Sequence, residues 1–476
     1  MTKICNIVGT AKRRYCVLLR NKKLSFTEGP IFWRIVLFAL PIMATGVLQI
    51  LYNMADNIVV GQFSGDPTAL GAVGSTSSLT NLLTNLLIGV SVGTSVVVAQ
   101  SFGAKNENMV SRTVHTALTF ALFGGLAFMG IGLLVARPAL ELMGTRPELL
   151  DGAVLYFSII CFGIPATAIY NFGAAVLRSV GDSKTPLIIL ASTGLVNVGL
   201  NFFFVIGCGM SVAGVAIATI VSQYLSAISV VLVLFTRRKE CYGFSFSKLV
   251  FDTTLLARIL RFGIPSGLQS SIFSISNVLL TSGINTLGTA AITAFTISNN
   301  IDSLTFTACN SFHQAALTFT GQNYGAGRHD RIKKIIIYSL VQVIVAGVFV
   351  GQTVLLFGEP IAGLYINATD PNKTQILAYT MEIMELLLTT YFICGIMDVF
   401  SGVLKGLGYS IIPMMVSLVC ICGFRIVWRF AVFPLEQFNT PSGLMFCYVI
   451  SWSLAALTFA GIVIYALLKI KRKNKT

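Results

Sequence analysis

Long apolar segments separated by short polar ones run along nearly the whole chain of 476 residues. Each apolar segment has at least about 20 residues, the length that a helix needs to cross roughly 30 Å of hydrocarbon. Because a helix satisfies its own backbone in lipid, the pattern predicts an all-α membrane protein. It predicts twelve membrane-spanning helices, at residues 32–62, 69–101, 111–136, 151–178, 185–207, 211–236, 263–287, 289–321, 332–357, 376–404, 410–433 and 441–468.

Composition agrees with this prediction, since 55% of the residues are hydrophobic, 11% are charged and the mean hydropathy is +0.81. Soluble chains carry about 25% charged residues, so a soluble protein is excluded. The sequence contains no Walker motif, no nucleophile elbow and no HExxH metal motif. We therefore expect that the protein is not an enzyme and that it uses neither a cofactor nor a motif-bound metal.

Basic residues are distributed unevenly over the predicted loops. With the N-terminus inside, the outward segments carry only Arg137, Arg146 and Lys373, and almost all other Lys and Arg residues lie on the inner side. The positive-inside rule then predicts that both termini are cytoplasmic. The basic segments 1–30 and 469–476 become a cytoplasmic leader and a cytoplasmic tail rather than arms that bind nucleic acid.

The two halves of the chain repeat short motifs in the same order. The corresponding pairs are Pro41 and Pro265, residues 99–104 and 321–326, and residues 175–186 and 402–413. We expect two pseudo-symmetric six-helix lobes, over residues 31–236 and 263–468. An even number of spans in each half places the symmetry axis along the membrane normal, which is typical of transporters that work by alternating access.

The segment between the lobes, residues 237–262, is predicted to be a cytoplasmic linker. Apolar and basic positions alternate over residues 248–261 as they do in an amphipathic helix. Such a pattern is typical of a helix that lies on the membrane surface.

Ionisable side chains inside a membrane are costly, so each indicates a candidate functional site. Asp56 lies near the outer end of the first span, and Asn197, Asn201 and Thr219 lie at similar depths in the fifth and sixth. An aspartate can hold a proton in a dry environment and release it when water arrives, and an oxygen cluster can instead bind a small cation such as Na⁺. The alternative is a carboxyl group with a purely structural hydrogen bond.

The second half carries a different set of charges inside its predicted spans, namely Asp302, Glu382, Glu385, Asp398, Arg425 and Arg429. Arg425 and Arg429 are four residues apart and share one face of an α-helix. An arginine in lipid has to find an acid or reach the interface, so we expect ion pairs with Asp302, Glu382 or Glu385. The alternative for this polar network is contact with substrate or the relay of protons.

Several of these segments resemble the multidrug and toxic compound extrusion (MATE) family. Leu40 and Pro41, followed by LYNMADNIVVG over Leu51–Gly61, are similar to the first helix of the family. The Gln-x-x-Gly-Ala segments and the Leu-Arg/Lys-x-x-Gly-x-x-x-x-Pro segments are similar to its repeated loop motifs. The resemblance covers residues 28–469 and is greatest to the DinF-like bacterial branch.

This resemblance implies a V-shaped fold of two six-helix bundles in the plasma membrane of a bacterium. It implies a non-enzymatic antiporter that exports drugs or toxic organic compounds, often cationic and apolar, against a flow of H⁺ or Na⁺. We expect it to function as a monomer in the lipid bilayer, with small molecules rather than nucleic acid as its partners.

The resemblance also assigns roles to residues of the first lobe. Asp56, fifteen residues after Pro41, matches the cation-binding carboxyl of the family, and Asn197 and Thr219 match its polar neighbours. Asn201 stands where members with a well-defined sodium site carry a second aspartate, which favours H⁺ over Na⁺ as the coupling ion. Pro41 is expected to kink the first helix, either as a fixed bend or as part of a switch.

The NorM-like branch of the family has an acid in the seventh helix and an aspartate in the tenth. The seventh predicted span has no acid, and Asp398 lies about one turn from the place of that aspartate, so that site is not assigned to this chain. The main alternative function is a lipid-linked glycan flippase of the same superfamily. Those proteins typically have fourteen spans and a strongly basic cavity.

Overall fold

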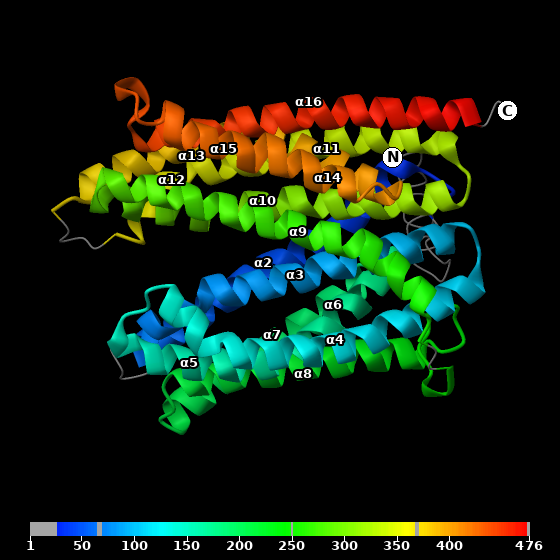
Figure 1. The fold of residues 1–476 in the computed structure, drawn as a ribbon, viewed down its shortest axis with the longest axis horizontal. Helices are drawn as coiled ribbons and strands as arrows, with labels where there is room; N and C mark the ends of the chain where they lie inside the picture. The colour runs from blue at the N-terminus through cyan, green and yellow to red at the C-terminus, as the bar shows by residue number, and fades with distance from the viewer. Residues whose placement is uncertain (1–25, 64–68, 249–250, 367–370, 474–476) are drawn as a thin grey trace, which may run out of the picture.

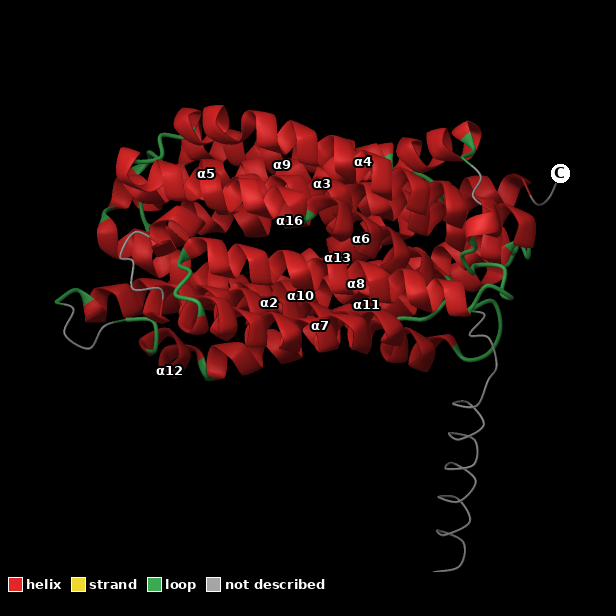
Figure 2. Ribbon diagram, turned by 90° about the horizontal axis from the view of Figure 1, so that it is seen from below, coloured by secondary structure: helices red, strands yellow, loops and turns green. Residues whose placement is uncertain are grey.

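A computed structural model describes residues 26–63, 69–248, 251–366 and 371–473 of the chain. Most of the predicted basic leader, residues 249–250 of the linker and the last residues of the predicted tail lie outside this part. Over the described residues the secondary structure consists of helices and the turns between them, without a strand (Figure 2). The predicted all-α class is therefore confirmed.

The first half of the chain forms six spans. They are α2 (Ile31–Phe63), α3 (Ala69–Gly103), α4 (Glu107–Leu142), the pair α5 (Pro147–Phe162) and α6 (Ile164–Ser179), α7 (Lys184–Phe202) with a π-helical turn at Phe203–Gly207, and α8 (Val212–Thr236). The fourth span is broken at Gly163, where α5 and α6 meet at 45°. Pro165 stands at the start of α6, where its missing N–H leaves no helical hydrogen bond unmade.

The second half forms the other six. They are α9 (Thr253–Ile284), α10 (Thr289–Gly325), α11 (His329–Leu356) followed by the short α12 (Gly358–Gly363), α13 (Lys373–Gly406), a span of α14 (Ile411–Val416) and α15 (Phe424–Val427), and α16 (Pro441–Lys473). Two π-helical stretches, Ser417–Gly423 and Trp428–Val432, complete the span of α14 and α15.

These elements correspond to the twelve predicted spans. Within the described residues, nine are apolar and long enough to cross a membrane, and the bent pair α5–α6 is a tenth. The remaining two, α9 and α10, have 32 and 37 residues and are more polar. Long helices that carry many Ser, Thr and Asn side chains need a polar environment along one face.

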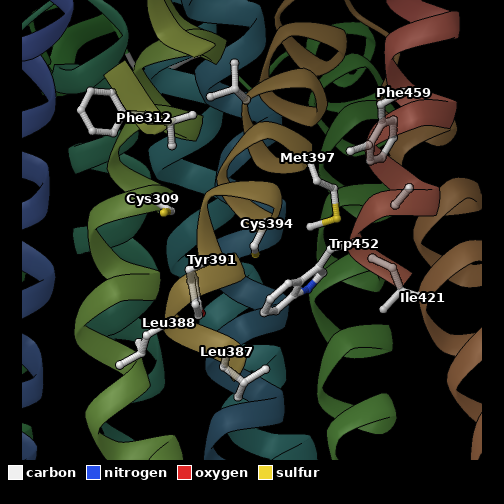
Figure 3. Close-up of a cluster of buried hydrophobic side chains, with 14 of the residues drawn as sticks. Cys309, Phe312, Leu387, Leu388, Tyr391, Cys394, Met397, Ile421, Trp452 and Phe459 are labelled. Atoms are coloured by element: carbon white, nitrogen blue, oxygen red, sulfur yellow. The ribbon is translucent and has the colours of Figure 1, made fainter. Parts of the chain in front are cut away.

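The helices form two lobes, α2–α8 and α9–α16, which lie one above the other in Figure 1. The central helices are α6 in the first lobe and α13 in the second, each packed against several helices of its own lobe. Figure 3 shows part of the core of the second lobe, where Tyr391 and Cys394 of α13 face Trp452 of α16. The two lobes are the pseudo-symmetric bundles that the repeated motifs predict.

Exposed polar side chains indicate a cleft between the lobes at the end opposite to the start of α2. The lobes meet through α2, α3, α9 and α10, which pack on one another across the boundary. In the half of each helix farther from that start, polar side chains are exposed, which is costly against lipid and favourable against water. These side chains are Asn53 and Asn57 of α2, Ser77 and Asn81 of α3, Asn277 and Thr281 of α9, and Thr296 and Asn300 of α10.

The other end, where α2 begins and α16 ends, is closed; we call it the terminal end. Gln100 Nε2 of α3 donates to the carbonyl of Gly406 in the second lobe at 2.9 Å. Gln322 Nε2 of α10 donates to the carbonyl of Ser179 in the first lobe at 2.7 Å. Both glutamines are buried, so these hydrogen bonds lie away from competing water.

Glycines bring the helices of the two lobes into backbone contact at this end. A Cβ atom on Gly103 of α3 would lie 1.9 Å from the carbonyl oxygen of Gln322. A Cβ atom on Gly325 of α10 would lie 1.9 Å from that of Gln100. The Gln-x-x-Gly-Ala motif therefore supplies both a hydrogen-bond donor and a site of close approach.

The separate amphipathic helix predicted over residues 248–261 is wrong, because residues 253–284 form one continuous helix, α9. Asp252 caps its start by accepting hydrogen bonds from the backbone of Thr254 and Leu255, and it pairs with Arg112 of α4. Ile259 is buried in the core of the first lobe. The predicted boundary at residue 263 therefore falls inside α9, whose first turns belong to the first lobe.

Candidate functional site

The site in the first lobe begins with the course of α2. Pro41 lies inside this helix, which continues as a helix to Phe63, and the Thr45 hydroxyl donates to the Pro41 carbonyl at 2.7 Å. Further along, the Tyr52 hydroxyl donates to the Ala191 carbonyl of α7 at 3.1 Å. Its ring lies against Gly194, where a Cβ atom would clash. This contact holds α2 against α7 one turn before Asp56.

Asp56 and three polar side chains of α7 and α8 form one cluster. Asn201 Nδ2 donates to Asp56 Oδ1 at 2.5 Å, and it lies 3.4 Å from Asn197 Oδ1. The Thr219 hydroxyl donates to the Val215 carbonyl at 2.9 Å and lies close enough to Asp56 to act on its carboxyl. The predicted site residues of the first lobe therefore lie together.

The cluster contains an acceptor without a donor. Asn201 is fully buried, and its Oδ1 atom has no hydrogen-bond partner among the described residues. A buried carbonyl oxygen of this kind is costly when it stays unpaired. A protonated carboxyl could donate to it, and a small cation could bind to it.

Tyr156 of α5 packs near this cluster, and the sequence did not single it out. Its phenol interacts electrostatically with the Asp56 carboxyl. A tyrosine in an apolar segment looks like an ordinary core residue, and no motif marks it. A phenol beside a carboxyl can donate a hydrogen bond to it and can link it to water in the cleft.

The cluster has no basic partner. Over the part of the chain that the structure describes, no Lys, Arg or His nitrogen lies within ion-pair distance, 4.0 Å, of the Asp56 carboxyl. Its contacts are amides and hydroxyls, which stabilise either protonation state. The π-helical turn Phe203–Gly207 begins two residues after Asn201, and such turns recur at functional sites.

The second lobe lacks a counterpart of this cluster. Leu280 and Trp428 stand at the positions that correspond to Asp56 and Asn201, and both are buried. Trp428 packs against the rings of Phe424, Phe438 and Phe446. The two lobes are thus alike in fold and different in chemistry.

The ion-pair network predicted for the second lobe is wrong. Asp302 Oδ2 accepts from the Tyr391 hydroxyl at 3.3 Å, and Glu382 Oε1 accepts from the Ser442 hydroxyl at 2.5 Å. Among the described residues, none of the ion pairs within 4.0 Å involves Arg425 or Arg429. The helix that carries the arginines is largely π-helical, so spacing along an α-helix does not give their direction.

Glu382, Glu385 and Asp398 make no ion pair with either arginine within 4.0 Å in the described part of the chain. Glu382 and Glu385 line a pocket between α13 and α16, together with Thr389 and Phe446. The backbone carbonyl of Asp398 lies 2.8 Å from Nδ1 of the buried His313. His313 is thus held by the backbone of α13 inside the lobe.

The model of the MatE family matches residues 41–203 and 265–430, which cover both lobes and include Asp56, Asn197 and Asn201. The chain belongs to the MATE family. This confirms the resemblance found in the motifs.

Similar proteins cover nearly the whole chain. "Probable multidrug resistance protein YoeA" of Bacillus subtilis is 27% identical over 85% of this chain and 87% of its own length. "Probable multidrug resistance protein NorM" of Thermotoga maritima is 26% identical, with coverages of 84% and 85%. These relatives do not favour the flippase alternative.

A solved structure extends the likeness to the fold. The structure described as the outward-facing conformation of a multidrug resistance MATE family transporter superposes with a TM-score of 0.86. It covers 96% of this MATE chain and 99% of its own, at 22% identity. The predicted V-shaped fold of two bundles is confirmed.

Proposed function

We propose that this MATE protein is a proton-coupled antiporter that exports drug-like organic compounds across the plasma membrane of a bacterium. The observation that carries the proposal is the Asp56 cluster, a carboxyl group bonded only to neutral donors beside the unpaired Asn201 oxygen. Relatives named as multidrug resistance proteins support the class of substrate.

In the proposed cycle, substrate leaves through the open end of the cleft and a proton then binds to Asp56. A protonated Asp56 donates to the free Asn201 oxygen, which draws α2 toward α7. The lobes rearrange, the terminal end opens, and the proton leaves to the cytoplasm while substrate enters. Proton binding and substrate binding each weaken the other through Asp56, and this reciprocal effect makes the exchange of proton for substrate obligatory.

A proton fits this cluster better than sodium does. A bound Na⁺ needs several oxygen ligands and enough negative charge to offset its own, and the cluster offers one carboxylate with three neutral side chains, Asn197, Asn201 and Thr219. A proton needs only the carboxylate and a partner for its hydrogen bond.

For the orientation in the membrane, we propose that both termini are cytoplasmic, because the basic residues are concentrated in the loops on that side.

The test is transport of a fluorescent dye by the purified protein in liposomes. We expect efflux under a pH gradient alone, little efflux under a sodium gradient alone, and none from Asp56→Asn. The matched control is Asn57→Asp in the Asp56→Asn background. It places a carboxyl one residue from the site, on the exposed face of α2, and we expect it not to restore efflux. Equal efflux from wild type and Asp56→Asn under a pH gradient would contradict the proposal.

A further inference from the structure

Arg425 is a buried charge in the wall of the second lobe. It belongs to α15, between the two π-helical stretches of its span, and it is only 1% exposed. Its guanidinium lies 3.8 Å from the centre of the Tyr448 ring of α16. π-helical turns recur at functional sites, and two of them flank this buried arginine.

All the hydrogen-bond partners that the structure gives Arg425 are neutral. Nη1 donates to the Ser276 hydroxyl and to Asn277 Oδ1 of α9, both at 3.2 Å, and Nε donates to the Ser451 hydroxyl at 3.4 Å. Among the described residues no carboxylate lies within 4.0 Å of it. A buried charge without a counter-ion is strongly unfavourable, so such a site attracts a negative group.

Asn277 connects this charge to the cleft. Its Oδ1 atom accepts from Arg425 and also from the Tyr448 hydroxyl at 3.2 Å. Since arginine only donates, the amide oxygen has to face the guanidinium, and the Nδ2 hydrogens point the other way. Asn277 is exposed on the polar face of α9, so its donors are available to a molecule in the cleft.

Arg429 adds a second positive charge near the same helix. It is half-buried, and its Nε atom is buried without a hydrogen-bond partner in the described part of the chain. Its side chain lies against Gly283 of α9, where a Cβ atom would come within 2.9 Å of it. The absence of a side chain at Gly283 makes room for the arginine beside the cleft-lining helix.

We propose that the Arg425–Asn277–Tyr448 group binds an anionic substituent of the transported compound, such as a carboxylate, a phosphate or a sulfonate. The Asn277 amide contacts the anion directly, Arg425 supplies the charge behind it, and the Tyr448 ring covers the guanidinium. This inference rests on the proposed transport function and names its substrate class: apolar compounds with a negative group, zwitterions included.

Charges of opposite sign then lie in the two lobes. The first lobe holds Asp56 without a basic partner, and the second holds Arg425 without an acidic one. A purely cationic compound would gain nothing from Arg425. The usual expectation of a cationic substrate, taken from the family resemblance, therefore does not extend to the second lobe.

The experiment compares two dyes that share one cationic xanthylium core: a rhodamine with a free carboxylate and its methyl ester. Binding of each to the purified full-length protein in detergent is followed by fluorescence polarisation, without any ion gradient. We expect Arg425→Gln to weaken binding of the carboxylate dye by roughly tenfold, because the attraction between the anion and the positive charge behind Asn277 is lost. The methyl ester should bind as it does to wild type.

Asn277→Asp is the decisive second variant, because it gives Arg425 a carboxylate partner at the position that now lies 3.2 Å away. It should raise the melting temperature, lower the affinity for the carboxylate dye by at least the same factor, and leave the ester unchanged. Arg425→Lys, which keeps the charge, should retain part of the preference for the carboxylate dye.

Equal effects of these variants on both dyes, or no effect of Asn277→Asp on the carboxylate dye, would overturn the proposal. The result is independent of the coupling mechanism. If gradient-driven efflux fails while the dye discrimination persists, the antiport cycle is wrong and the anion site stands.

Discussion

Gln100 and Gln322 make the same hydrogen bond in opposite directions across the two lobes. Each occupies the first position of a repeated Gln-x-x-Gly-Ala motif, and each donates to a carbonyl, of Gly406 and of Ser179, that belongs to the second repeated motif of the other lobe. The amide oxygens are used as well: Gln100 accepts from Arg258 at 3.2 Å, and Gln322 accepts from the Phe26 backbone at 3.0 Å. The two repeats thus close the terminal end symmetrically.

Loss of either glutamine should loosen that end. Gln100→Leu or Gln322→Leu leaves a buried carbonyl without its donor, which costs about 1–3 kcal/mol. We expect backbone hydrogen–deuterium exchange to rise at least about fivefold in peptides that cover residues 99–104 and 321–326, because 1 kcal/mol corresponds to roughly that factor.

The matched control is Gln352→Leu, since Gln352 is exposed on α11. It should leave exchange at the terminal end unchanged. Wild-type exchange in both Gln100→Leu and Gln322→Leu would show that the two hydrogen bonds do not hold the lobes together.

The close backbone contacts at Gly103 and Gly325 give a second prediction about the closed terminal end. In Gly103→Ala or Gly325→Ala the new methyl group starts 1.9 Å from a backbone carbonyl, and real Cβ atoms essentially never come closer than 3.0 Å. The helices have to move apart, so we expect a lower melting temperature and reduced transport. Gly130→Ala in α4 has open space around its methyl group. It should be neutral or stabilising by up to about 1 kcal/mol, the helix preference of alanine over glycine.

A salt bridge at the terminal end gives a prediction for pH. Arg237 Nη1, just after α8, lies 2.7 Å from Asp182 Oδ2, in the turn between α6 and α7. Burial would raise the pKa of Asp182, but hydrogen bonds from Thr185 and from Arg237 outweigh it and hold the pKa below its ordinary value. Stability from this carboxylate is present above the unfolded-state pKa, about 3.9, and is lost as the pH falls through the folded-state pKa.

Asp182→Asn should therefore lower the melting temperature near pH 7, by about 2 °C for a loss of roughly 1 kcal/mol. The difference from wild type should shrink as the pH falls below about 3.9, where the unfolded-state carboxylate takes up protons, and should vanish below the lower pKa of the native carboxylate. The measurement is a thermal unfolding series in detergent over pH. A difference that grows on acidification would contradict the assignment.

The sequence was sufficient for the spans and for the contents of the first site. Lipid leaves helices as the main solution for long apolar segments, so their positions follow from hydrophobicity. Depth along the span then places Asp56, Asn197, Asn201 and Thr219 near one level, and the structure brings them together.

The direction in which a side chain points from its helix was harder to predict than its depth in the membrane. The pairing expected for Arg425 and Arg429 assumed a regular α-helix, but π-helical stretches lie on both sides of α15, so α-helical spacing does not give the directions of these side chains. Tyr156 was missed because it is one tyrosine in an apolar segment without a motif, and no spacing rule gives which helices pack near Asp56. The start of α9 was predicted too late in the chain, at residue 263. Its first turns have the amphipathic pattern of a surface helix, but they pack on the first lobe.

The central claim is that substrate and proton exclude each other through Asp56, and proton release on substrate binding tests it most directly. The purified protein is kept in weakly buffered detergent with a pH indicator, and the two rhodamines are added at a series of pH values. The account predicts release of up to about one proton per protein from the wild type and none from Asp56→Asn. No release at any pH from wild-type protein that binds dye, or equal release from Asp56→Asn, would contradict it.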